Sequence, residues 1–146
     1  MFSRHALIGA VSVLSLTTAA SAQDATHIWH YWGGGAELAA IESVIDLANE
    51  TYPDLNVEGQ VIPGNAIEMR RQLQTALLGG TPPAAYQSSM GYELKTFADA
   101  GQLRSIEAVW DEVNGGEIFP AGLQRVMKVD GVPYGLPLNM AIVSNI

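Results

Sequence analysis

The chain has 146 residues and a formal net charge of −8, with 15 acidic residues against 7 basic ones and no cysteine. An acidic chain without a basic cluster is poorly suited to bind nucleic acid or an anionic membrane, and we attribute the charge to solubility. The lack of cysteine excludes disulfides, thiolate chemistry, cysteine-based metal sites and a lipid anchor on cysteine.

The first 22 residues have the pattern of a secretory signal peptide. Arg4 precedes an apolar run over residues 6–16, and small residues lead up to Ala22. A buried helix is the alternative, but residues 6–22 carry no charge and no amphipathic face. The run is too short to span a bilayer comfortably. We therefore expect cleavage after Ala22 and, for a bacterial source, a periplasmic protein that does not span the membrane.

Residues 27–50 read as a strand, a glycine turn and a helix. Aromatic and apolar residues over 27–32 predict a strand, which the glycines at 33–35 end. From Glu37, apolar residues recur at helical spacing until Pro53 stops the helix. This is the first half of a βαβ unit, and ligands of open α/β sheets bind at the carboxyl ends of such strands.

The middle of the chain repeats this alternation. Residues 55–62 predict a second strand, residues 67–78 an amphipathic helix, and residues 84–88 a short third strand. Strands that alternate with helices of this length imply a parallel, doubly wound α/β sheet. Within the helix, solvent-exposed surface is expected for Arg70, Arg71 and Gln74.

The last third of the chain is more broken. Helices are expected over 92–100, 106–113 and 120–127, with the Asn-Gly-Gly run at 114–116 ending the second of them. Asp130-Gly131 predicts a tight hairpin, because these residues supply positive φ angles. The final residues are apolar and strand-like without a stop signal, so the end looks cut.

Several local patterns, in their order along the chain, together resemble the sugar-binding proteins of ABC importers, in the large extracellular solute-binding group. The match is closest to the glucose- and mannose-type branch and covers nearly all of the chain after the leader. The matching stretches are Tyr31-Trp32 with Glu37, residues 50–57 (ETYPDLNV), 78–83 (LGGTPP) with Tyr86-Gln87, 98–103 (ADAGQL) and 130–137 (DGVPYGLP).

The resemblance implies two α/β lobes that close over a sugar through a hinge. Residues 23–133 would form an incomplete N-terminal lobe of periplasmic-binding-protein-like fold, and residues 134–146 would begin the first hinge strand. Because family members are much longer, the chain is expected to be a fragment that does not carry sugar by itself. A full-length parent would have two partners, the sugar and an ABC permease in the inner membrane. Where close relatives have Asp, His and a His-Arg pair, this chain has Ala84, Ser89 and the run 140–143, which leaves the sugar unidentified.

A sugar site needs an aromatic ring for the apolar face of the sugar and fixed polar groups for its hydroxyls. By composition alone Tyr31 and Trp32 are more typical of a core, but the resemblance favours them as this platform. Trp29 lies deeper in the strand and is expected in the core. Glu37 either accepts sugar hydroxyls or complements the helix dipole. The remaining candidate contacts are Gln87 and Ser89 after the third strand and, more weakly, Asn139.

Two other functions stay open at this point. An exported carbohydrate-active hydrolase would need paired carboxylates, for which Glu37, Asp99 and Glu107 are available without a spacing that specifies a pair. An interaction module without a ligand would recruit a partner strand to the sheet edge. We expect no catalytic residues, no cofactor and no metal site. The glycine run lacks the third glycine of a dinucleotide fingerprint, and the two histidines of the first strand have no third ligand nearby.

Overall fold

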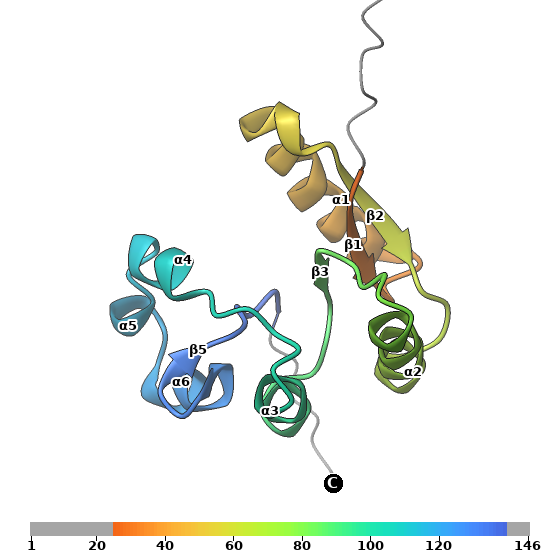
Figure 1. Ribbon diagram of the computed structural model, residues 1–146. Helices are drawn as coiled ribbons and strands as arrows, with labels where there is room; N and C mark the ends of the chain where they lie inside the picture. The colour runs from red at the N-terminus through yellow and green to blue at the C-terminus, as the bar shows by residue number, and fades with distance from the viewer. Residues whose placement is uncertain (1–24, 140–146) are drawn as a thin grey trace, which may run out of the picture.

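The computed structural model of the protein describes residues 25–139 (Figure 1). The first half contains β1 (Thr26–His30), α1 (Gly35–Thr51), the 3-10 helix η1 (Pro53–Leu55), β2 (Val57–Val61), α2 (Ala66–Leu78) and β3 (Ala85–Tyr86). The second half contains α3 (Tyr92–Asp99), α4 (Glu107–Glu112), α5 (Gly115–Ile118), α6 (Ala121–Met127), β4 (Lys128–Val129) and β5 (Val132–Pro133). The expected leader and residues 140–146 of the expected hinge strand lie outside the described residues.

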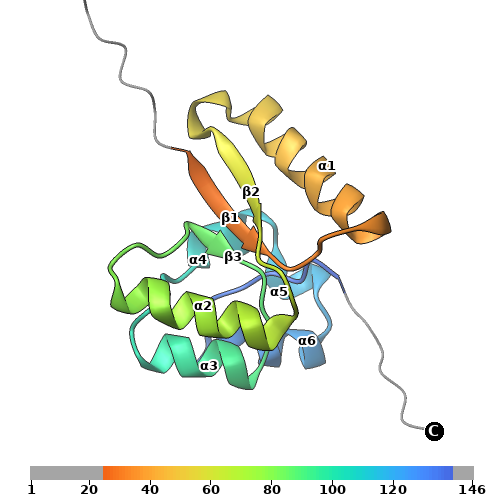
Figure 2. The same ribbon diagram turned by 90° about the vertical axis from the view of Figure 1, so that its right-hand side faces the viewer.

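The predicted parallel α/β sheet is confirmed. Its strand order is β2-β1-β3, and β1 pairs in parallel with both neighbours, with Thr26 opposite Val57 and Ile28 opposite Ala85. After β1 the chain forms β2 on one side of β1, and it then crosses over to form β3 on the other side. Since parallel crossovers are right-handed, α1 and α2 are placed on opposite faces, and Figure 2 shows the sheet between them.

Helix α1 is fixed to the sheet through its buried Ile41 and through Asn49. The Asn49 side chain donates to the Val57 carbonyl oxygen at 2.9 Å and accepts from the Val57 N–H at 2.7 Å. Helical spacing from Glu37 onward predicts Asn49 on the polar side of α1, whereas its amide is half-buried and joins the end of α1 to the start of β2. Close packing also explains a glycine in β2, because a Cβ on Gly59 would lie 2.7 Å from Ile45 Cδ1.

Helix α2 is capped at its N-terminus by Asn65, whose Oδ1 accepts from the Ile67 N–H at 2.9 Å. Met69 and Leu73 of this helix are fully buried. The buried face of α2 is narrower than its amphipathic pattern predicts, because Ile67 is exposed and Leu78 is 90% exposed. Helical spacing identifies one buried stripe, and residues at its margins depend on neighbours that the pattern does not reveal.

In the second half, α3 to α6 and a small hairpin lie together beside the sheet (Figure 1). The buried apolar side chains of this half are Leu94, Phe97, Trp110, Met127 and Val129. The hairpin β4–β5 turns at Asp130 and Gly131 with φ of 50° and 87°, as predicted. The prediction for residues 114–116 was wrong in one respect. Asn114 does leave the helical region, with φ of 52°, but α5 begins at the next residue.

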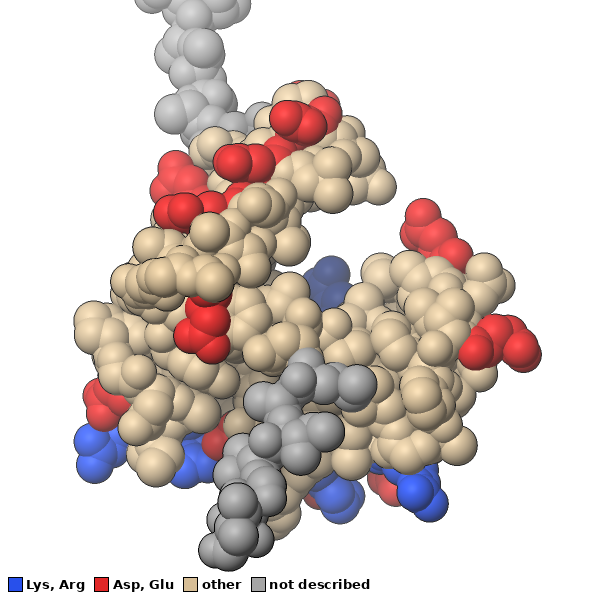
Figure 3. Space-filling view, turned by 180° about the vertical axis from the view of Figure 1, so that it is seen from behind, with Lys and Arg blue, Asp and Glu red and all other residues tan. Residues whose placement is uncertain are grey.

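Charge is divided unevenly over this fold. In the described part of the chain every Lys and Arg lies at residue 70 or beyond, whereas α1, η1 and β2 carry only acidic charged residues. Figure 3 shows acidic side chains gathered over one end of the molecule and most of the basic ones at the other. Among residues 25–139 no helix has the length and apolar character needed to cross a membrane.

Candidate functional site

Parallel pairing brings the carboxyl ends of β1, β2 and β3 to one edge of the sheet. Tyr31 and Trp32 follow β1, and Gln87 to Ser89 follow β3. The N-termini of α1 and α2 start at the same edge, where unpaired N–H groups give a partial positive charge. Most of the side chains predicted to contact a sugar therefore converge here.

Gln87 connects the ends of two strands. Its side-chain Oε1 accepts a hydrogen bond from the Tyr31 N–H at 3.1 Å, and its own N–H donates to the Trp29 carbonyl oxygen at 2.8 Å. The second bond continues the β1–β3 ladder, while the first holds the segment that leaves β1. The structure thus joins two of the predicted residues, Tyr31 and Gln87.

Tyr31 is half-buried and lies in the field of two carboxylates. Burial raises the pKa of its phenol above the ordinary value, and the nearby charges of Glu93 and Glu37 raise it further. Glu37 is exposed in the first turn of α1. A neutral phenol and the exposed carboxylate of Glu37 offer both a donor and acceptors, which is the polar chemistry that sugar hydroxyls require.

The two tryptophans differ in exposure from the sequence-based expectation. Trp32, expected as an open platform, is only 6% exposed. Trp29, expected in the core, is half-buried and lines two hollows of about 830 Å³ and 420 Å³ that open to solvent. Position along the strand does not decide exposure here, because Trp29 inside β1 borders solvent whereas Trp32, beyond the end of β1 at His30, is buried. Ala25 and Thr26 line the smaller hollow, which puts it at the amino ends of the strands, away from the predicted site.

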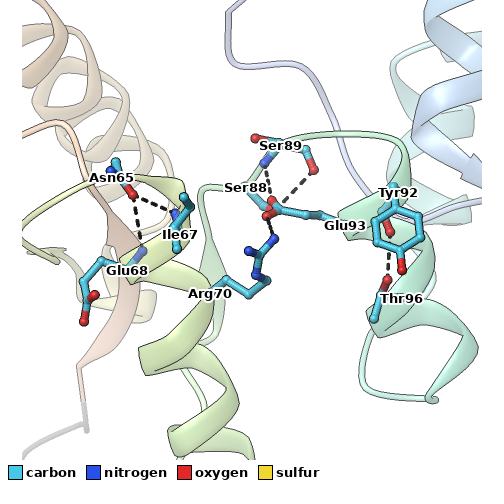
Figure 4. A network of polar contacts seen from close by, with 9 residues as sticks. All are labelled: Asn65, Ile67, Glu68, Arg70, Ser88, Ser89, Tyr92, Glu93 and Thr96. Carbon is cyan, nitrogen blue, oxygen red and sulfur yellow. Dashed lines mark hydrogen bonds and ion pairs between the residues drawn. The ribbon is translucent and has the colours of Figure 1, made fainter.

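Glu93 is a member of this edge that the sequence analysis missed. Its carboxylate, in the first turn of α3, forms an ion pair with Arg70 of α2. Its Oε2 also accepts from Ser88 Oγ at 3.0 Å and from the Ser89 N–H at 3.2 Å (Figure 4). Arg70 is therefore not the simple solvated residue that we expected. An acidic residue in a first helical turn just after a strand end was the available signal.

The other predicted residues are less connected. Ser89 is exposed and reaches the network through its backbone N–H. Asn139 is exposed at the last described position, and none of the side-chain hydrogen bonds within residues 25–139 links it to the edge. Of the carboxylates considered for hydrolysis, Asp99 accepts from Lys95 Nζ at 2.9 Å and Glu107 from Ser105 Oγ at 3.1 Å. Asp99 is thus engaged within α3 and Glu107 by a residue just before α4, and neither is hydrogen-bonded to Glu37 among residues 25–139.

Tyr86, the last residue of β3, has a buried hydroxyl next to the predicted site residue Gln87 in sequence. Its hydroxyl is enclosed without a hydrogen-bond partner among the described residues. Burial, with a smaller contribution from Glu93, raises the pKa of Tyr86 to about 12. The ring meets Phe97 edge to face at a centroid distance of 6.0 Å, so α3 is held against the sheet.

Comparison with known proteins supplies relatives but no complete match. No family model matches the chain. An uncharacterized ABC transporter extracellular-binding protein of Pyrococcus horikoshii is 26% identical over 114 residues, which is 77% of this chain and 26% of that protein. A probable sugar-binding periplasmic protein of Rhizobium meliloti is 28% identical over 135 residues, which is 90% of this chain and 31% of that protein. The chain thus spans about a quarter to a third of the curated relatives it matches.

Solved structures agree on the fold. CpMnBP1 with bound mannotriose is 22% identical and superposes with a TM-score of 0.64 over 77% of this chain and 28% of its own. The galacto-N-biose-/lacto-N-biose I-binding protein of the ABC transporter from Bifidobacterium longum is 23% identical, with a TM-score of 0.63 over 82% and 29%. These findings confirm the resemblance stated from the sequence and the assignment to part of a binding-protein lobe.

Proposed function

We propose that this chain, a relative of the sugar-binding proteins of ABC importers, contributes one wall of a sugar site in a solute-capture protein. The wall is the edge where β1 and β3 end. Its proposed contacts are Tyr31, Glu37, Gln87 and Ser89, with Trp32 packed inside and Asn139 as an outlying candidate. The observation that carries the proposal is the hydrogen bond from Tyr31 to Gln87, because it brings residues 56 positions apart to one polar edge.

Two further parts of the proposal concern the cell. Export to the periplasm, with cleavage after Ala22, is supported by the three-part pattern of residues 1–22 and by relatives that are described as periplasmic. An ABC permease in the inner membrane is the proposed partner of the whole protein, and it is supported by the relatives' description as ABC transporter components. Binding without turnover, and no cofactor, is the proposed chemistry.

A single exposed edge encloses little of a sugar, and enclosure supplies most of a small ligand's buried surface. We therefore expect weak contact, of the order of millimolar, and not the tight capture of an enclosed site. Saturation-transfer NMR detects contacts of this strength. Suitable probes are mannobiose, β-galactose and lacto-N-biose, the sugars of the structural neighbours.

Two glutamates of the same helix make a matched pair for this measurement. Glu37→Gln should lower the saturation transferred to the sugar at least roughly twofold, because a charged acceptor forms stronger hydrogen bonds than an amide. Glu42→Gln, an exposed change further along α1, should leave it unaltered. The proposal would be contradicted if none of the three sugars received saturation from the protein, or if Glu37→Gln and Glu42→Gln had equal effects. Cleavage products from the disaccharides would favour a hydrolase instead.

A further inference from the structure

Glu93 joins α3 to α2, where Arg70 lies 23 positions earlier, and to the loop just before α3. Its side chain is only 13% exposed, although it belongs to the first turn of a surface helix. One carboxylate oxygen faces Arg70 on α2, and the other accepts from Ser88 Oγ and the Ser89 N–H in the loop after β3 (Figure 4). The start of α3 is itself anchored, since the Gly91 N–H donates to the Val126 carbonyl oxygen at 3.0 Å.

This set of partners calls for a carboxylate. Within residues 25–139, the groups that bond to Glu93 all act as donors toward it: a guanidinium, a hydroxyl and a backbone N–H. A carboxylate accepts at both oxygens, whereas an amide of the same size would turn an NH₂ donor toward one of these donors. The charge is also favourably placed at a helix N-terminus.

The loop that Glu93 holds is the one that carries the predicted sugar contacts of β3. Gln87 immediately precedes Ser88, and its side chain accepts from the Tyr31 N–H. Gln87 is therefore held in place from both sides along the chain, by the β1–β3 ladder before it and by the Ser88–Ser89 turn after it. With that turn released, only the ladder would constrain the amide that faces Tyr31.

We propose that Glu93 is a positioning residue of the sugar site, which fixes the loop 87–89 so that its polar groups stay aligned with Tyr31. Glu93 acts through the loop and need not touch the sugar. The inference rests on the proposed function, but the state of the loop can be measured without any sugar. The competing explanation is that Glu93 serves only as an ion pair between α2 and α3.

Arg70→Gln and Glu93→Gln separate the two explanations. Arg70→Gln removes the ion pair but leaves the bonds to Ser88 and Ser89, whereas Glu93→Gln disturbs all of them while keeping the side-chain volume. Glu117→Gln, an exposed first-turn glutamate of α5, is the neutral control. The readouts are hydrogen exchange of the Ser89 amide and saturation transfer to the same three sugars.

We expect Glu93→Gln to speed exchange at Ser89 roughly tenfold, the scale for loss of a hydrogen bond to a charged group, and to reduce the sugar signal at least by half. Arg70→Gln should do distinctly less to both. The phenol titrations of Tyr31 and Tyr86 should shift down in Glu93→Gln, which verifies that the folded variant has lost this charge.

Each other outcome overturns the inference. Equal effects of Arg70→Gln and Glu93→Gln on Ser89 would reduce Glu93 to an ion-pair partner. Faster exchange with an unchanged sugar signal would show that the loop position does not matter for binding. If the unaltered protein gives no sugar signal, the proposed function fails and the role in a sugar site fails with it, while exchange at Ser89 still reports whether Glu93 holds the loop.

Discussion

Gly115 offers the clearest test of how the helical part of the molecule is packed. It is buried at the start of α5, directly against the ring of Trp110. A Cβ at this position would lie 2.5 Å from Trp110 Cδ2 and 2.6 Å from Cε2, far inside van der Waals contact. The ring has little room to retreat, because Phe119 lies against it at 5.5 Å between centroids and Lys128 Nζ lies 4.6 Å from its centroid.

The expected effect of Gly115→Ala is the sum of two opposing contributions. Forcing a methyl group into a packed core lowers the free energy of unfolding by about 1–3 kcal/mol. Replacing glycine by alanine in a helix raises it by about 0.5–1 kcal/mol. The net expectation is a loss of about 0–2.5 kcal/mol, which lowers the melting temperature of a chain of this size by up to roughly 10 °C.

The neighbouring residue supplies the control. Gly116 is exposed in the same helix, and a Cβ there would meet nothing within 4 Å. Gly116→Ala should therefore keep the propensity gain and leave stability unchanged or slightly raised. Thermal unfolding followed by tryptophan fluorescence measures both variants. If Gly115→Ala proves as stable as Gly116→Ala, the close packing of Trp110 against α5 is wrong.

Three further outcomes are expected. Intact-mass measurement of the exported protein should show loss of the residues up to Ala22, and retention of the initiating methionine would contradict the leader. Asn49→Ala should lower the free energy of unfolding by about 1–3 kcal/mol in denaturant titration, because both polar groups of Val57 lose their partner. The pKa of Tyr86 is about 12 in the folded protein, above its ordinary value of 10.0. The contribution of the neutral phenol to the free energy of unfolding should therefore be fully present below pH 10 and should be lost as the pH rises to 12. Solvent screening of a partly buried phenol limits that decline to about 1 kcal/mol, and Tyr86→Phe should reduce it in unfolding measurements at pH 9 and 12.

Periodicity and turn chemistry carried most of the fold prediction. The helix after the glycine run and the Asp130-Gly131 turn both follow from local rules, and the structure places them within a few residues of expectation. The parallel sheet also followed, since strands alternated with helices of crossover length. Such features depend on neighbours within one or two turns, which the sequence displays directly.

The missed features depend on partners that are far apart along the chain. Arg70 and Glu93 are 23 positions apart, and no local sequence pattern around either residue indicates that they pair. Asn49 looked like a surface residue because its partner is the backbone of Val57, which has no side-chain signature. The exposure of Trp29 and Trp32 depended on where β1 stops. For the site, the edge could be predicted, but not which groups hold it in place.

The central position of β1 also sets an order of assembly in time. In the sheet that residues 25–139 form, β1 pairs with both β2 and β3, which do not pair with each other. Synthesis runs from the N-terminus, so β1, α1 and β2 can form a paired unit before β3 has been made. The bond from Tyr31 to Gln87 closes a loop of 56 residues and must wait for β3 to add to the other side of β1. The proposed sugar edge is therefore among the last parts of the sheet to form, and slow folding would leave β1 with one edge open until then.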